Sequence, residues 1–79
     1  NAEIQFEWFM KSISSNYTTA QPYLKIFLEK IGRRKFILPL YEALYKNEST
    51  RQIALDWFSQ FKQNYHAVSV NSIADVLEL

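Results

Sequence analysis

The sequence predicts an all-α fold of about five helices packed as antiparallel pairs. Apolar residues recur at helical spacing along almost the whole chain. The breaks between these segments carry residues that start and stop helices, and the one short segment that could be extended has no strand partner. Antiparallel helix pairs joined by short turns are typical of a slice of a right-handed α–α superhelix of the HEAT or armadillo type.

The first helix is predicted over residues 2–14, with Asn1 as its cap, because an asparagine side chain can accept from the free N–H groups of a first turn. Its apolar positions are Ile4, Phe6, Trp8, Phe9, Met10 and Ile13. They form more than one stripe, and a helix that is apolar on two faces needs neighbours on two sides. We therefore expect packing partners outside this chain, and self-association of the 79 residues when isolated.

The second helix is expected to begin near Thr18 or Thr19, with Pro22 close to its first turn, where a missing N–H costs little. Its buried face is predicted to comprise Tyr23, Leu24, Phe27, Leu28 and Ile31. Gly32 follows at the position where a left-handed residue would end the helix, since glycine adopts positive φ without steric cost.

Three further helices are predicted. The third starts no earlier than residues 34–36, because Pro39 cannot donate a backbone hydrogen bond four residues back. The fourth covers residues 50–63, and a short fifth is capped by Ser69, although residues 68–70 are also compatible locally with an extended segment. The predicted buried faces are, in order, Ile37, Leu40, Tyr41, Leu44 and Tyr45; Ile53, Ala54, Trp57, Phe58 and Phe61; and Ile73, Val76 and Leu77.

Length and composition exclude several classes of function. The 79 residues make one small domain, 1–79, which we expect to be a fragment of a larger protein because it opens without Met. The lack of cysteine removes disulfides, thiolate metal sites and a cysteine nucleophile. A net charge of +1 supplies no global field for nucleic acid or an anionic membrane, and no apolar run reaches the roughly 18 to 20 residues that cross a bilayer. We therefore expect the protein to bind neither nucleic acid nor a membrane, and we expect a cytoplasmic location.

Few residues could carry out chemistry. His66 is the only histidine, so the chain cannot form a multi-histidine zinc site by itself. We expect it to bond the backbone or pack beside the preceding tyrosine, because no positioned nucleophile or carboxylate accompanies it. The carboxylate pairs Glu3 with Glu7 and Glu48 with Asp56 fit solvated helix faces better than an acid–base pair. No catalytic and no metal-binding residue is predicted.

Three consecutive cations lie in the run Gly32-Arg33-Arg34-Lys35-Phe36, between the second and third predicted helices. Cations that follow a helix C-terminus are favourable there and need no ligand. At the N-terminus of the next helix, each is opposed by roughly 0.3 to 1 kcal/mol unless an anion compensates. Local chemistry slightly favours the first interpretation and leaves the second, a local anion-binding site, open.

Four segments together resemble one known domain along essentially the whole chain. They are Asn1-x-Glu3-Ile4-x-Phe6-x-Trp8, Pro22, Gly32-Arg33-x-Lys35-Phe36-x-x-Pro39-Leu40 and Tyr65-His66. The resemblance is to the C-terminal helical domain of the leukotriene A hydrolase and aminopeptidase family, which are zinc metallopeptidases of the His-Glu-x-x-His class. The chain departs from the family pattern at Arg34, which is usually apolar, and at Ala67, where a proline often follows the histidine.

The resemblance implies a noncatalytic domain of a hydrolase that releases N-terminal residues from peptides. The zinc and its ligands would lie in the missing catalytic domain of the same polypeptide, so that the 79 residues alone bind no zinc and are inactive. Arg33 and Lys35 match the family residues that face the cleft and bind the carboxylate of a peptide or of a leukotriene-type epoxide. Two alternatives are weighed against this function: a structural or protein-interaction module of helical repeats, and, less well supported, an electrostatic nucleic-acid binder.

Overall fold

The computed structural model describes residues 1–79 and contains helices and turns but no strand, which confirms the all-α class. The α-helices are α1 (Ala2–Ser14), α2 (Gln21–Lys30), α3 (Arg34–Lys46), α4 (Arg51–Phe61) and α5 (Ala67–Val76). Two 3-10 turns, Thr18–Ala20 and Lys62–Asn64, precede α2 and follow α4. None of the helices is long and apolar enough to span a bilayer.

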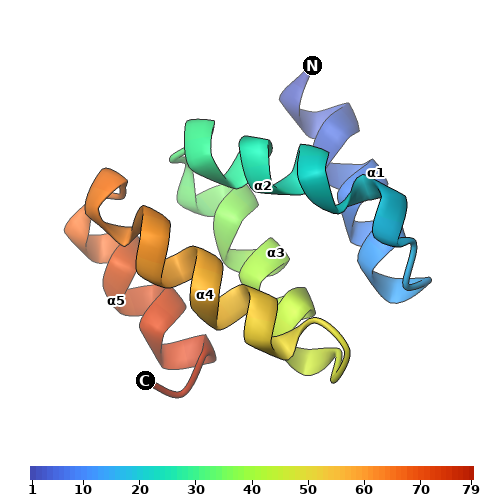
Figure 1. The fold of residues 1–79 in the computed structure, drawn as a ribbon. Helices are drawn as coiled ribbons and strands as arrows, with labels where there is room; N and C mark the ends of the chain where they lie inside the picture. The colour runs from blue at the N-terminus through green and yellow to red at the C-terminus, as the bar shows by residue number, and fades with distance from the viewer.

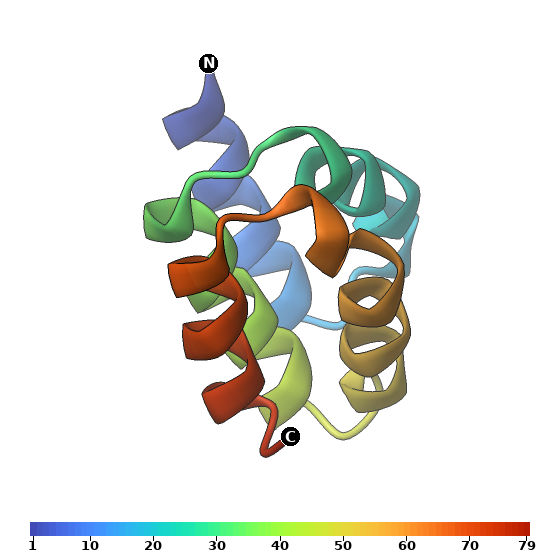
Figure 2. The same ribbon diagram turned by 90° about the vertical axis from the view of Figure 1, so that its left-hand side faces the viewer.

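The helices form two layers (Figure 2). Helices α1, α3 and α5 lie side by side in one layer, and α2 and α4 form the other. The central helix α3 contacts α1, α4 and α5, while α2 contacts α4. The N-terminus and α1 lie at one edge, and α5 lies at the other (Figure 1). With extents of 29 × 28 × 17 Å, the domain is a thin two-layer slab, as expected for a slice of a helical repeat.

The core is centred on α3. Ile37, Leu40, Tyr41 and Leu44 are fully buried, and α5 adds Ile73 from the same layer. Burying one such aliphatic side chain stabilises a fold by about 1.5 to 3 kcal/mol relative to leaving it exposed. Helix α3 therefore holds the two layers together and gives its own N-terminus a fixed position.

The observed bounds of α1, Ala2–Ser14, match the predicted range of residues 2–14. The Asn1 Oδ1 atom accepts from the backbone N–H of Glu3 at 2.9 Å and of Ile4 at 3.4 Å, which confirms the predicted cap. Helix α1 buries Phe9 and other residues of one face, whereas Trp8 on its second apolar face remains 43% exposed.

The predicted left-handed conformation of Gly32 is wrong. Helix α2 ends at Lys30, Ile31 follows in extended backbone (φ −96°, ψ 111°), and Gly32 does not have a positive φ. A left-handed residue would let the chain fold back and satisfy the last carbonyls of the helix. Here the Leu28 carbonyl accepts from the Tyr65 hydroxyl at 2.7 Å, so a side chain distant in sequence does part of that work.

The start of α5 also differs from the prediction. The helix begins at Ala67, and the Nδ1 atom of His66 accepts from the Val68 N–H at 3.3 Å. The predicted cap, Ser69, is wrong because this residue is already inside α5 and buried. The expected backbone-bonding role of His66 is confirmed. Helix α3 begins at Arg34, within the predicted range, and contains Pro39.

Candidate functional site

The two predicted anchor residues lie at the N-terminus of α3. Arg33 precedes the helix in extended backbone (φ −78°, ψ 119°), and its carbonyl accepts from the N–H groups of Phe36 at 2.9 Å and Ile37 at 3.1 Å. The helix has no side-chain cap and no acidic residue in its first turn. The positive end of its dipole is therefore not compensated by a residue of the helix itself, and the cations lie where an added anion would be favourable.

Arg33 and Lys35 are brought together around one aromatic ring. The Arg33 Cζ atom lies 5.8 Å, and the Lys35 Nζ atom 5.2 Å, from the centroid of the Phe36 ring, which are cation–π distances. The Phe36 ring is buried and packs against Phe6 of α1 at 5.5 Å and Phe27 of α2 at 6.2 Å between ring centroids. Two other helices thus hold the ring that both cations share.

Lys35 is also paired within the chain. Its Nζ atom lies 2.9 Å from Oε1 of Glu3, in the first turn of α1. The hydrogen bond and the charge of Lys35 hold the pKa of the Glu3 carboxyl below its usual value, and the charge of Arg33 adds to this effect. A shallow pocket of about 310 Å³, bounded by Glu3, Glu7 and Phe36, lies beside this pair.

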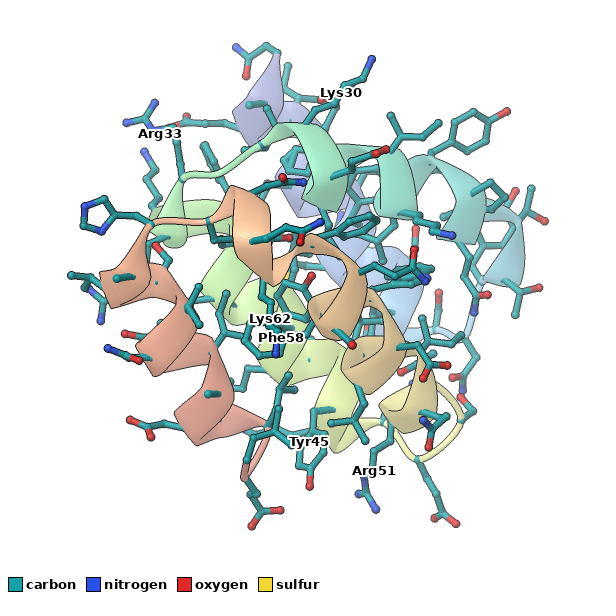
Figure 3. The ribbon with its side chains drawn as sticks, turned by 60° about the vertical axis from the view of Figure 1, so that its left-hand side comes forward. Lys30, Arg33, Tyr45, Arg51, Phe58 and Lys62 are labelled. Carbon is teal, nitrogen blue, oxygen red and sulfur yellow. The ribbon has the colours of Figure 1, made fainter.

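Arg33 has no acidic partner. The structure contains a second ion pair, between Lys46 and Glu42, and neither pair includes Arg33. Its side chain is exposed and extends from the α2–α3 connection away from the helices (Figure 3). Arg34 is exposed as well, but it makes no contact with the Phe36 ring within cation–π range. Of the two cations that lie beside the Phe36 ring, Arg33 is therefore the one without an internal ion pair, and an external anion can reach it.

A groove of about 600 Å³ runs between α1 and α2. We call it the α1–α2 groove; it is lined by Gln5, Trp8, Phe9, Tyr23, Ile26, Phe27, Lys30 and Ile31. Tyr23 is 61% exposed, so its predicted place in the core is wrong, and Ile26 is 50% exposed. Helical spacing identifies apolar positions, but it does not tell which of two apolar stripes the protein's own core covers.

The residues of this chain do not fit a zinc site. No three His, Cys, Asp or Glu side chains lie close enough to share a metal ion. Zinc in proteins is held by three or four such ligands. His66 is exposed and uses its Nδ1 atom to cap α5.

A family model described as "Leukotriene A4 hydrolase, C-terminal" matches residues 1–77. The chain belongs to this family. Leucine aminopeptidase 2-2 of Scheffersomyces stipitis is 40% identical over 86% of this chain and 10% of its own length. Aminopeptidase B of Mus musculus is 31% identical over 98% and 12%, and leukotriene A-4 hydrolase of Xenopus laevis is 29% identical over 100% and 13%. The chain spans about a tenth of the length of these relatives. No solved structure matches it.

The domain also contains a buried pair of hydrogen-bonded tyrosines, Tyr41 and Tyr65, whose contact the sequence analysis did not predict. The Tyr65 hydroxyl donates to the Leu28 carbonyl at 2.7 Å and lies 2.9 Å from the Tyr41 hydroxyl. Because Tyr65 has one proton to donate, the Tyr41 hydroxyl is the donor in the second bond. Burial raises the pKa of Tyr65 to about 12 and also raises that of Tyr41. A buried tyrosine hydroxyl needs a hydrogen-bond partner, and this requirement is the signal in the sequence that could have indicated the pair.

Proposed function

We propose that this domain is the noncatalytic C-terminal part of a zinc metallo-aminopeptidase, in which it forms one wall of the substrate cleft. The zinc and the catalytic residues belong to a catalytic domain elsewhere in the same polypeptide. The names of the relatives, two of them aminopeptidases and one a leukotriene A-4 hydrolase, support this assignment, as does their greater length. Aminopeptidase activity is the primary proposal, because hydrolysis of a leukotriene-type epoxide requires a lipid-shaped pocket that other domains would have to build.

In this proposal Arg33 binds the free carboxylate of the substrate. The observation that carries it is an exposed arginine without an acidic partner, restrained over the buried Phe36 ring at the N-terminus of α3. A guanidinium presents a planar fork that matches both oxygens of a carboxylate. Lys35 adds a point charge, but its ammonium group already pairs with Glu3, so its contribution to substrate binding is secondary.

A carboxylate contact of this kind acts at the far end of the substrate. Because this contact would fix the far end of the substrate, it would also align the scissile bond with the zinc of the catalytic domain. Part of the binding energy is then used to orient the reacting group. Its loss therefore lowers turnover as well as affinity.

The rest of the same polypeptide is the proposed partner of the α1–α2 groove. The exposed apolar side chains of Trp8 on α1 and of Tyr23 and Ile26 on α2 line this groove. Contiguous apolar surface of this kind marks an interface. The relatives are about eight times as long as this chain, so they contain ample sequence to cover the groove.

The groove also favours the second candidate, a helical-repeat interaction module without a substrate role. The presence of His-Glu-x-x-His in the full-length polypeptide separates the two functions, because its absence excludes the zinc peptidase.

The carboxylate role is tested by Arg33→Ala in the full-length enzyme, with Arg34→Ala as the matched control for charge. Loss of a charge-assisted hydrogen bond of about 1.5 to 3 kcal/mol lowers kcat/KM for a peptide roughly 10- to 150-fold. We expect the control to remain within about twofold of wild type, since exposed charges away from a contact have small effects. Wild-type kinetics in Arg33→Ala would exclude the anchor.

A further inference from the structure

We propose that Tyr65 is a positioning residue for Arg33. Its hydroxyl caps the C-terminal end of α2 and thereby holds the short connection that carries the arginine. The inference rests on the proposed role of Arg33, but it concerns a residue from a different part of the chain.

The first step is the way in which α2 ends. The last carbonyls of a helix have no partner within it. The Phe27 carbonyl accepts from the N–H of Ile31 at 2.8 Å, and the Leu28 carbonyl accepts from the Tyr65 hydroxyl at 2.7 Å. Since Gly32 is not left-handed, the usual backbone closure is absent and the side chain of Tyr65 takes its place.

The second step is that the Tyr65 hydroxyl joins two helices. It donates to a carbonyl of α2 and accepts from the hydroxyl of Tyr41, which belongs to α3. Tyr65 itself follows the 3-10 turn Lys62–Asn64 and is 8% exposed, while Tyr41 is fully buried. Hydrogen bonds shielded from water in this way are electrostatically stronger than exposed ones and restrict the geometry. One atom thus links the helices on either side of the connection.

The third step leads to Arg33. Only Ile31, Gly32 and Arg33 separate α2 from α3. On the α3 side, the Arg33 carbonyl is held by the N–H groups of Phe36 and Ile37. On the α2 side, the Tyr65 bond holds the last turn. With so short a connection, movement of the α2 end displaces Arg33, and a misplacement of about 1 Å can lower a rate by as much as about a hundredfold.

The experiment measures kcat/KM in the full-length enzyme for a peptide with a free C-terminal carboxylate and for the same peptide with a C-terminal amide. The quotient of the two values is the carboxylate preference. We expect Tyr65→Phe to lower this preference by about three- to tenfold. The matched control, Tyr41→Phe, keeps the bond to Leu28 and removes only the link to α3, so we expect it to lower the preference less than Tyr65→Phe does.

A second variant keeps the test conclusive if Tyr65→Phe fails to fold. That variant leaves the Tyr41 hydroxyl buried without its acceptor, whereas the double variant Tyr41→Phe/Tyr65→Phe removes both hydroxyls and avoids this penalty. It still lacks the cap, so we expect it to lower the carboxylate preference as well. We also expect the amides of residues 31–33 to exchange hydrogen faster in both Tyr65 variants than in Tyr41→Phe.

The outcomes separate the two proposals. A role of Tyr65 in stability alone would lower kcat/KM equally for both peptides, and an unchanged preference in both Tyr65 variants would overturn the positioning role. If Arg33→Ala nevertheless lowers the preference, the anchor survives and the positioning role alone fails. If Arg33→Ala leaves the preference unchanged, the proposed function fails and the positioning role fails with it.

Discussion

The Nζ atom of Lys35 lies 2.9 Å from Oε1 of Glu3, so the second cation of the Gly32-Arg33-x-Lys35 segment is already bonded within the chain. Arg33, which shares the Phe36 ring with Lys35, has no such partner. The two cations are therefore not equivalent. A substrate carboxylate would meet Arg33 directly, and it would compete with Glu3 for Lys35.

This competition makes Glu3→Gln an informative change. Removing the carboxylate releases Lys35 and leaves the N-terminus of α3 more positive, so KM for carboxylate-bearing peptides should fall about two- to fivefold at low ionic strength, and less at high salt. Steady-state kinetics of the full-length enzyme would measure this. The control is Glu7→Gln, which removes the same charge one turn further along α1 but leaves the Lys35–Glu3 ion pair in place. An equal fall in both variants would argue for a general charge effect.

Gly32→Ala should be tolerated. The φ angle of Gly32 is not positive, and a Cβ atom at this position would meet no heavy atom within 4 Å. Because alanine has less conformational freedom than glycine in the unfolded chain, we expect the free energy of unfolding to rise by about 0.4 to 1 kcal/mol. Urea unfolding of the 79-residue domain would measure it. A clear loss of stability would instead indicate that Gly32 has the left-handed conformation predicted from the sequence.

The buried tyrosine pair makes the domain sensitive to alkaline pH. Burial raises the pKa of Tyr65 from 10.0 to about 12, so the folded state keeps a proton that the unfolded state loses. The contribution to stability is full below about pH 10 and is lost as the pH rises towards 12. Tyr41, whose pKa is also raised, acts in the same direction. Unfolding free energies across this range should fall less steeply for Tyr41→Phe/Tyr65→Phe than for wild type, and equal slopes would refute this assignment.

The isolated 79 residues should self-associate through the α1–α2 groove, because its apolar surface lacks its partner. Ile26→Glu, which places a charge in the groove, should shift the chain towards monomer in sedimentation equilibrium. The control is Val68→Glu on α5, since Val68 is similarly exposed but lies outside the groove. A wild-type chain that stays monomeric at high concentration would contradict the proposed interface.

The parts of the fold that depend on neighbouring residues could be predicted from the sequence. The Asn1 cap reaches only two and three residues along the chain, and the start of α3 follows from Pro39. The end of α2 could not be predicted, because its cap comes from Tyr65, 37 residues beyond Leu28.

The candidate site shows the same division. The family resemblance assigns Arg33 and Lys35 to an anion site, but the different states of the two cations depend on Glu3, which lies 32 residues before Lys35. Likewise, the apolar stripe that includes Tyr23 was visible, but whether the core covers it depends on how α1 and α2 pack.

The central claim, that Arg33 binds the carboxylate of the substrate, is tested most directly by a double-mutant cycle. It combines wild-type and Arg33→Ala full-length enzyme with a peptide acid and its C-terminal amide, and takes the coupling free energy from the four kcat/KM values. A direct contact predicts a coupling of about 1.5 to 3 kcal/mol. A coupling within about 0.3 to 0.5 kcal/mol of zero, the range of independent sites, would contradict the claim.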